Sequence, residues 1–174
     1  TASISLQEVV HRIANDWSRQ TGATAQLQLQ VPGTLTNSQV RFDVDHLRQV
    51  LVNLLDNAKR YASGRVASIQ VWVHAGDGPH ATVSVWSDGA PMEASVERHL
   101  FEPFFSSESR SSGLGLYISR ELCERHGATL TYQRSAGTVA GELAEGNAFT
   151  LQLHLSSADG SGDHNDAPWQ TSLY

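Results

Sequence analysis

A stripe of carboxamide side chains, followed by a guanidinium, recurs at helical spacing. Gln49, Asn53, Asn57 and Arg60 are separated by four, four and three positions, so one helix would carry them on a shared face. Carboxamide oxygens suit a hard cation such as Mg²⁺, which completes its shell with water and nucleotide phosphates. Arg60, with Lys59 beside it, would neutralise phosphate charge. The competing interpretation is an ordinary exposed helical face rich in Asn and Gln.

A second candidate element for binding a ligand is the glycine pair Gly113 and Gly115, within SSGLGL at 111–116. Glycine lets the backbone approach a ligand closely, and the unpaired N–H groups at the start of a helix attract anions. A helix is predicted over 113–126, so the pair would cradle a phosphate at its N-terminus. By itself this pattern is weak evidence, because short glycine motifs arise by chance.

Two further segments lie between these elements. SDGAPM at 87–92 follows a predicted strand, and an Asp-Gly pair in that position forms a turn in most proteins. FEPFF at 101–105 is apolar enough to anchor a long loop to the core. Residues 106–112 are small and polar, as expected of a segment that covers and releases a ligand. Arg110 either reaches phosphate from there or stays solvated.

Apolar periodicity predicts the helices that would position these groups. One helix spans 6–20, with Ser5 and Glu8 forming a capping box. The carboxamide stripe lies on a second helix over 45–62, with Asp45 as its cap. The apolar residues on another face of that helix are Leu47, Val50, Leu51, Leu54, Leu55 and Ala58.

Alternation of apolar and polar residues predicts strands at 26–31, 39–43, 69–73, 83–85, 130–133 and 149–155. The first two are expected to pair through a turn at Pro32 and Gly33. The next two form a hairpin at the centre of the sheet, since Asp77 and Gly78 are a strong turn signal. The order of elements predicts an α/β fold, a two-layer sandwich of a mixed, mainly antiparallel sheet on about three helices.

Composition narrows the class of protein. With 174 residues and 40% hydrophobic content, the chain can fill one core, predicted over 1–156, ahead of a polar tail over 157–174. A net charge of -6 without a Lys/Arg run argues against nucleic-acid binding. No apolar run approaches the roughly 18 residues that cross a bilayer, so no direct membrane contact is expected of this domain. The start at Thr1 suggests a piece of a longer protein.

Sulfur and imidazole side chains do not suggest a metal centre. Cys123 is the single cysteine and lies in an apolar helical pattern, which favours a buried structural thiol and a reducing compartment. The eight histidines are scattered without the spacing of metal ligands. His11 and His46 lie on predicted helices and are poor candidates for accepting a phosphate.

In order, NLLDNAKRY at 53–61, SDGAPM, FEPFF and SSGLGL resemble the ATP-binding catalytic domain of bacterial two-component sensor histidine kinases. LYISRELCERHGA, at the end of this series, is most similar to the nitrogen-regulation and type IV pilus branches. GNAFTL at 146–151 resembles the last box of the family. The resemblance implies the Bergerat ATP-binding fold of the wider GHKL class, with ATP and Mg²⁺ as cofactors.

The resemblance also implies roles at the phosphate end of the site. Asn57 would coordinate Mg²⁺, Asn53 would lie near the metal and the γ-phosphate, and Arg60 and Tyr61 would lie beside the phosphates. Related gyrase and chaperone ATPases have a glutamate that activates water in place of Asn53, and an amide cannot act as that base. The glycine-rich box would contribute Gly113, Leu114, Gly115 and Leu116.

At the adenine end, the chain departs from the family pattern. Aligned on Gly89, Ser87 replaces the aspartate that accepts from the adenine amino group, and Pro91 replaces a glycine. The acceptor would be Ser87, Asp88 after a shift of the turn, or a water molecule. A neutral acceptor forms a weaker bond than a charged one, so adenine recognition is expected to be weakened but retained. The remaining residues expected at the nucleotide are Phe104 and Thr150.

The implied function is transfer of the γ-phosphate of Mg-ATP to a histidine on a separate dimerisation domain, and then to a response-regulator aspartate. Such chemistry depends mainly on positioning and charge neutralisation. The domain would lie in the cytoplasm, as one end of a membrane-anchored sensor. An alternative is a nucleotide-binding regulatory module without phosphotransfer, motivated by Ser87 and Pro91. FEPFF counts against an anti-sigma-type serine kinase, and Asn53 against a gyrase-like ATPase.

Overall fold

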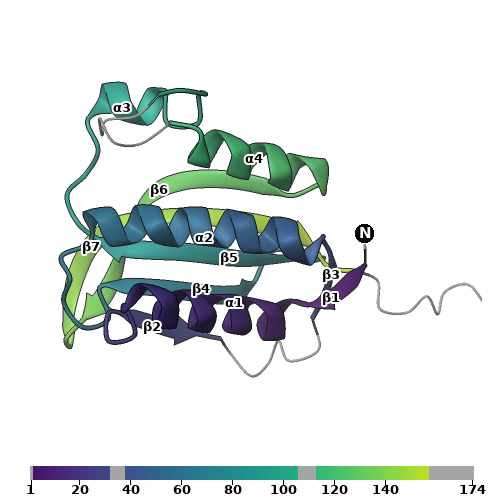
Figure 1. Ribbon diagram of the computed structural model, residues 1–174, viewed down its shortest axis with the longest axis horizontal. Helices are drawn as coiled ribbons and strands as arrows, with labels where there is room; N and C mark the ends of the chain where they lie inside the picture. Colours follow the sequence, from purple (N-terminus) through teal and green to yellow (C-terminus); the bar gives the residue numbers. More distant parts are fainter. Residues whose placement is uncertain (1, 32–37, 106–112, 157–174) are drawn as a thin grey trace, which may run out of the picture.

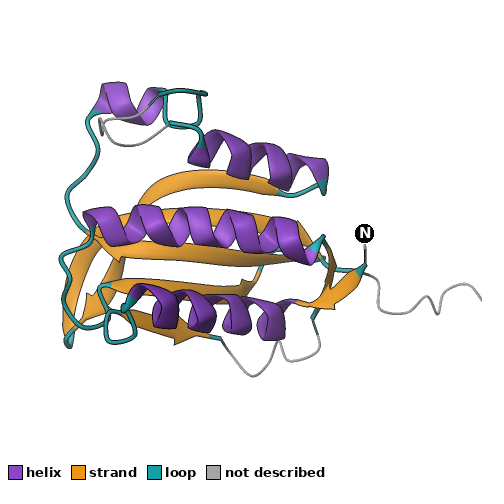
Figure 2. Cartoon of the chain, viewed as in Figure 1, coloured by secondary structure: helices purple, strands orange, loops and turns teal. Residues whose placement is uncertain are grey.

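The computed structural model describes residues 2–31, 38–105 and 113–156. Its elements are β1 (Ser3–Ser5), α1 (Leu6–Thr21), β2 (Leu27–Gln30), β3 (Gln39–Arg41), α2 (Val44–Tyr61), β4 (Ile69–Ala75), β5 (His80–Asp88), α3 (Ala94–Arg98), α4 (Gly115–Arg125), β6 (Thr129–Val139) and β7 (Glu142–His154). One sheet has the strand order β2-β4-β5-β7-β6, and α1, α2 and α4 cover one of its faces (Figure 1; Figure 2). The predicted two-layer α/β sandwich is therefore confirmed.

Some predictions lie outside the described residues. These are the turn at Pro32 and Gly33, the covering segment 106–112, which contains Arg110, and the polar tail 157–174. Two described elements escaped sequence analysis because they are very short: β1, and α3 within the loop that follows β5.

The core lies between the helices and the inner face of the sheet. The apolar stripe predicted for α2 is buried in full, and α1 buries its own stripe through residues such as Ile13 and Trp17. Both stripes pack with inner-face residues such as Val71 and Val85. Burying one large aliphatic side chain contributes about 1.5–3 kcal/mol, so this layer dominates the stability of the domain.

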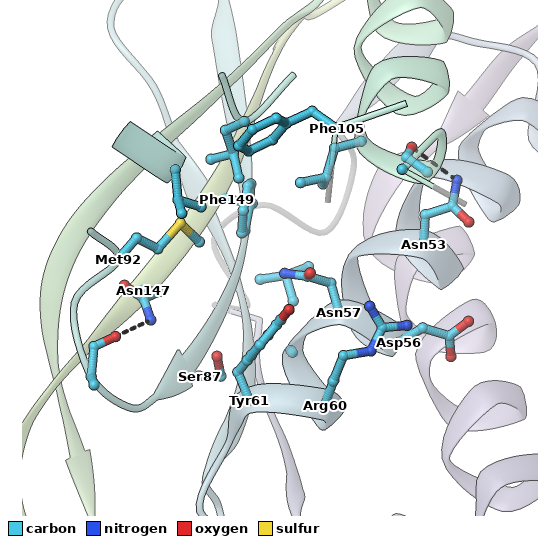
Figure 3. Close-up of a pocket in the computed structure, with 18 of the residues that line it drawn as sticks. Asn53, Asp56, Asn57, Arg60, Tyr61, Ser87, Met92, Phe105, Asn147 and Phe149 are labelled. Carbon is cyan, nitrogen blue, oxygen red and sulfur yellow. Dashed lines mark hydrogen bonds between the residues drawn. The ribbon is translucent and has the colours of Figure 1, made fainter. Parts of the chain in front are cut away.

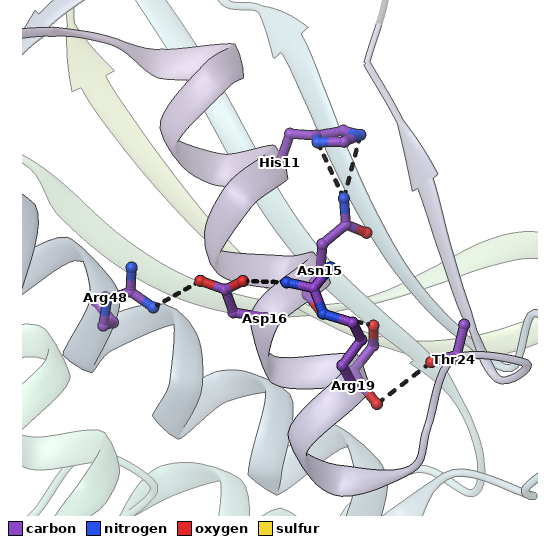
Figure 4. Close-up of polar contacts among 7 residues, drawn as sticks. His11, Asn15, Asp16, Arg19, Thr24 and Arg48 are labelled. Carbon is purple, nitrogen blue, oxygen red and sulfur yellow. Dashed lines mark hydrogen bonds and ion pairs between the residues drawn. The ribbon is translucent and has the colours of Figure 1, made fainter.

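Polar contacts also join the two long helices. The Trp17 indole donates to Asp56 Oδ1 of α2 over 2.9 Å. Asp16 of α1 accepts from Arg19 at 2.6 Å and lies 3.6 Å from Arg48 of α2 (Figure 4). The Asp16–Arg19 pair lies within α1, whereas the Asp16–Arg48 pair connects the two helices; both are partly exposed and therefore contribute little to stability.

The helix caps differ from those predicted. Ser5 is the N-cap residue of α1, but its side chain makes no capping hydrogen bond, so the capping box with Glu8 does not form. In α2 the cap is Asp43, whose carboxylate accepts from the His46 backbone N–H at 3.0 Å. The prediction of Asp45 was wrong, because the helix starts at Val44 and places Asp45 inside its first turn.

Strand pairing was correctly predicted for the hairpin and wrongly for the first two strands. β4 and β5 pair antiparallel within the sheet, with Val71 opposite Val85. β2 does not pair with β3: it runs parallel to β4, with Leu29 opposite Val71. β3 pairs instead with β1, and Val40 is fully buried there. Both segments are extended as expected, but their partners come from distant parts of the chain.

A second, smaller apolar cluster lies on the outer face of the sheet around Trp86. β6 and β7 are longer than predicted, and their extended hairpin closes over this side chain, which is fully buried. The Trp86 indole donates to the Ser135 carbonyl over 2.9 Å. A Cβ at Gly137 or Gly146 would lie 2.8 or 2.5 Å from the Trp86 ring, so the indole needs a glycine at both positions.

Candidate functional site

A cavity of about 750 Å³ opens between α2, the inner face of the sheet and the start of α4 (Figure 3). The predicted site residues that line it are Asn53, Asn57, Arg60, Tyr61, Ser87, Gly113, Gly115 and Leu116. The structure therefore brings together three segments that were singled out separately in the sequence. The predicted residues that do not line it are Asp88, Gly89, Phe104, Leu114 and Thr150.

The α2 wall carries the carboxamide stripe. The Asn53 Nδ2 group donates to the Gly115 carbonyl over 3.3 Å and to Ser119 Oγ over 3.2 Å, so this amide joins α2 to the first turn of α4. Asn57, one turn further along, points into the cavity (Figure 3). Arg60 and Tyr61 are exposed at its rim. Together they form a polar, cationic wall.

The sheet forms the floor, and strand alternation decides which residues reach it. Val85 and Ser87 of β5 line the cavity, as do Asn147 and Phe149 of β7. Thr150 belongs to the opposite face, where its hydroxyl lies 2.8 Å from that of Ser84. The structure therefore places Thr150 away from the predicted adenine pocket.

The Asp88 carboxylate is also directed away from the cavity. It accepts from the Ser63 backbone N–H at 2.9 Å and from Ser63 Oγ at 2.7 Å, next to the C-terminal end of α2. Asp88 is buried and satisfied in this structural role. Of the two side chains considered as acceptors for the base, the structure leaves Ser87 facing the cavity.

The three phenylalanines of FEPFF lie in different environments. Phe101 packs edge-to-face on Phe149, with ring centroids 6.2 Å apart, which supports the predicted anchoring role. Phe105 lines the cavity, whereas Phe104 is 78% exposed. The sequence therefore predicted the wrong phenylalanine at the site: Phe105 lines the cavity in place of Phe104.

Gly113 is required by a contact within the protein itself. Its φ is +74°, and a Cβ there would lie 2.6 Å from the Phe104 carbonyl carbon. The Phe104 N–H donates to the Gly113 carbonyl over 2.9 Å, so FEPFF is bonded directly to the glycine-rich motif. Gly115 begins α4 on the cavity wall, and Leu114 is the N-cap residue of that helix.

A hydrogen-bonded network, here called the turn tether, holds the loop after β5 and was missed in the sequence. It consists of Tyr132, Arg134 and Asn147 with the Gly89 and Ala90 carbonyls. Asn147 Nδ2 donates to the Ala90 carbonyl over 3.1 Å, and its Oδ1 accepts from the Tyr132 hydroxyl at 2.5 Å and from Arg134 at 3.1 Å. Arg134 also donates to the Gly89 carbonyl over 2.7 Å.

The protonation state of the turn tether follows from its surroundings. Burial, with a smaller contribution from the Glu97 carboxylate, raises the pKa of Tyr132, so the phenol stays protonated and donates. The sequence contained one signal for this network: Asn147 precedes Phe149 by two positions, so an alternating strand carries both side chains on the same face.

Cys123 and the histidine pair His46 and His126 do not line the cavity. Cys123 is buried as predicted, and its burial raises the pKa of the thiol to about 12. His46 Nδ1 and His126 Nε2 lie 2.9 Å apart between α2 and the end of α4. Within the described residues, no group of three or more His, Cys, Asp or Glu side chains could hold a metal ion. None of the helices in that part of the chain is long and apolar enough to span a membrane.

Comparison with known proteins links this chain to one family. A model for histidine kinase-, DNA gyrase B- and HSP90-like ATPases matches residues 42–157. The sensor protein kinase PilS of Pseudomonas aeruginosa is 36% identical over 133 residues, which cover 75% of this chain and 25% of PilS. This chain therefore spans about a quarter of the length of that curated relative.

Solved structures share the fold. The mycobacterial sensor histidine kinase MprB matches with a TM-score of 0.70 at 23% identity, over 88% of this chain and 97% of that one. Histidine kinase ThkA, solved in complex with response regulator protein TrrA, matches with a TM-score of 0.67 at 20% identity, over 89% of this chain and 42% of that one.

Proposed function

The chain belongs to the family of histidine kinase-, DNA gyrase B- and HSP90-like ATPases, and we propose that its cavity positions Mg-ATP for transfer of the γ-phosphate to a histidine of a dimerisation domain. Membership of the family, together with a relative named as a sensor protein kinase, confirms the resemblance stated from the four motifs. The proposal goes further, because it assigns a direction to the nucleotide and roles to residues.

The division of the cavity wall supports this orientation of ATP. On the α2 side, Arg60 offers a guanidinium near the end of that helix, and the N-terminus of α4 offers backbone N–H groups beside Asn53; both kinds of group suit phosphates. Val85, Met92 and Phe149 line the sheet side, where a flat base would be sandwiched between apolar groups. The observation that carries the proposal is this convergence of a basic helical wall, a helix N-terminus and an apolar floor on one cavity.

The residues at the phosphate end fit a magnesium ion. Asn57 presents a carboxamide into the cavity and would hold Mg²⁺, as part of a shell completed by phosphate and water oxygens. The ion supplies neutralisation of charge on the phosphates. Asn53 holds α4 against α2 through its amide nitrogen and offers no base to activate water, which favours phosphotransfer over hydrolysis.

The acceptor and the later partners are also proposals. A dimerisation domain of the same protein would supply the histidine, and a response regulator would receive the phosphate from it. The neighbour ThkA is described in complex with such a regulator, which supports this partnership. Because ATP is held in the cytoplasm, we place the domain there, within a longer and membrane-anchored sensor.

The site assignment is tested by Asn57→Ala, with Gln49→Ala as a matched control. Gln49 belongs to the same helix and stripe but is exposed and does not line the cavity. In calorimetric titrations with a non-hydrolysable ATP analogue, Asn57→Ala should weaken magnesium-dependent binding by about tenfold or more, equivalent to 1.4 kcal/mol. Gln49→Ala should bind like the wild type. Equal magnesium-dependent affinity in both variants would remove Asn57 from the site.

Phosphotransfer needs its own measurement, because binding alone fits a regulatory module as well. The wild-type domain should label an added dimerisation domain with phosphate from ATP, and Asn57→Ala should slow that labelling. Tight nucleotide binding without any transfer would favour the regulatory module over the kinase.

A further inference from the structure

The base end of the cavity has a neutral floor. Among the described lining residues, the polar side chains contributed by the sheet are Ser87 and Asn147. Ser87 is only 5% exposed, and Figure 3 shows it beneath the cavity, between Tyr61 and Asn147. Neither side chain carries a charge, so the hydrogen bonds that they can donate or accept decide which edge of a nucleotide base binds to them.

Of these two groups, Ser87 is the one that can accept from a ligand. The Asn147 oxygen already accepts from Tyr132 and Arg134, and its nitrogen donates one N–H to the Ala90 carbonyl, so this amide has only a donor to offer. The Ser87 hydroxyl can rotate and act as either donor or acceptor. The floor therefore presents an adaptable group where a carboxylate would present only acceptors.

Nearby carboxylates do not supply the missing acceptor on the floor. Asp88 accepts two hydrogen bonds from Ser63, next to the C-terminal end of α2, and Asp56 of α2 accepts from the Trp17 indole of α1. Glu93 lines the cavity as the exposed N-cap residue of α3, where water screens its charge. Within the described residues, the floor itself thus lacks a fixed negative charge.

This matters because purines differ at their 6-position. Adenine presents an amino donor next to a ring-nitrogen acceptor, whereas hypoxanthine and guanine present a carbonyl acceptor next to an N–H donor. A carboxylate bonds the amino group and repels the carbonyl, so it discriminates by repulsion as well as attraction. A hydroxyl bonds either edge by rotating.

We propose that this domain accepts 6-oxopurine triphosphates, such as inosine and guanosine triphosphate, with affinities comparable to that for ATP. Ser87 is the residue that would allow both adenine and 6-oxopurine bases to bind. The inference rests on the proposed function, since it requires the base to lie over the floor and the phosphates at the α2 and α4 wall.

The test is calorimetric titration of the domain with the magnesium complexes of an imido ATP analogue and of inosine triphosphate. Inosine lacks the 2-amino group, so it isolates the 6-position from steric effects. The wild type should bind both within about tenfold of each other, the discrimination that one ordinary hydrogen bond provides. Ser87→Asp should raise the preference for the ATP analogue by about tenfold or more, and Ser87→Ala should weaken both ligands by similar factors.

Two control variants locate the effect. Ser84→Ala lies on the same strand but on the opposite face, and should leave the ratio of affinities unchanged. Glu93→Gln should also leave the ratio of affinities unchanged. A large change of that ratio would mean that the Glu93 carboxylate binds the base and determines the selectivity.

The outcomes separate this inference from the proposed function. If the ATP analogue binds and inosine triphosphate binds more than about tenfold more weakly, the relaxed selectivity is overturned while the ATP site stands. A lack of binding by either nucleotide at millimolar concentration would overturn the proposed function and the inference with it.

Discussion

The turn tether offers the sharpest test of how the structure supports its cavity. Asn147→Ala removes the donor to the Ala90 carbonyl and the acceptor shared by Tyr132 and Arg134. Arg134 keeps its bond to the Gly89 carbonyl, so the loop loses part of its attachment to β6 and β7 and keeps the rest. The variant should therefore fold, with a loosened loop after β5.

The magnitude follows from the bonds that are lost. A neutral hydrogen bond contributes about 0.5–1.5 kcal/mol net, and one to a charged group about 1.5–3 kcal/mol. Tyr132 and Arg134 are partly exposed, so water replaces some of what they lose and the lower values apply. Losing two neutral bonds and one charge-assisted bond should then lower the free energy of unfolding by about 2–3 kcal/mol.

Urea unfolding followed by circular dichroism measures this change by linear extrapolation. Tyr132→Phe removes one bond and should cost about 1 kcal/mol, while Gln152→Ala, at an exposed position of β7, should have little effect. Nucleotide affinity should fall in Asn147→Ala and stay unchanged in Gln152→Ala. An Asn147→Ala protein within about 0.5 kcal/mol of the wild type, the range of ordinary surface substitutions, would refute the tether.

Two further predictions concern the helices. Asp43→Ala should lower the melting temperature by about 2–4 °C through loss of the α2 cap, and Asp45→Ala should lower it less; equal shifts would contradict the cap assignment. The hydrogen bond from the His46 N–H is the main cause that lowers the pKa of Asp43 below its ordinary value of 3.8. The contribution of this cap to the free energy of unfolding is therefore fully present above pH 3.8 and is lost as the pH falls through the lowered pKa. With a pKa raised to about 12, Cys123 should resist iodoacetamide at pH 9 in the native domain and react in urea, and rapid labelling of the native domain would argue against its burial.

Local patterns in the sequence determined the three long helices and the central hairpin. The stripe from Leu47 to Ala58 is buried as its spacing predicts, because 3.6-residue periodicity is a property of consecutive residues. The hairpin of β4 and β5 was equally readable, since its turn and both strands are close in the chain. The order of the four motifs sufficed to predict the family, because each motif is a short contiguous segment.

Tertiary structure decided which strands pair and which side chains face the cavity. β2 joins β4 across about forty residues, and a period of two shows that a segment is extended without naming its partner. The same ambiguity explains why Thr150 was predicted at the site and Asn147 was not. Alternation divides the residues of a strand between two faces, but only packing in the fold decides which face lines the cavity. Asp88 turned to Ser63 because a buried carboxylate needs donors, and its nearest donors come from the end of α2, brought close only by folding.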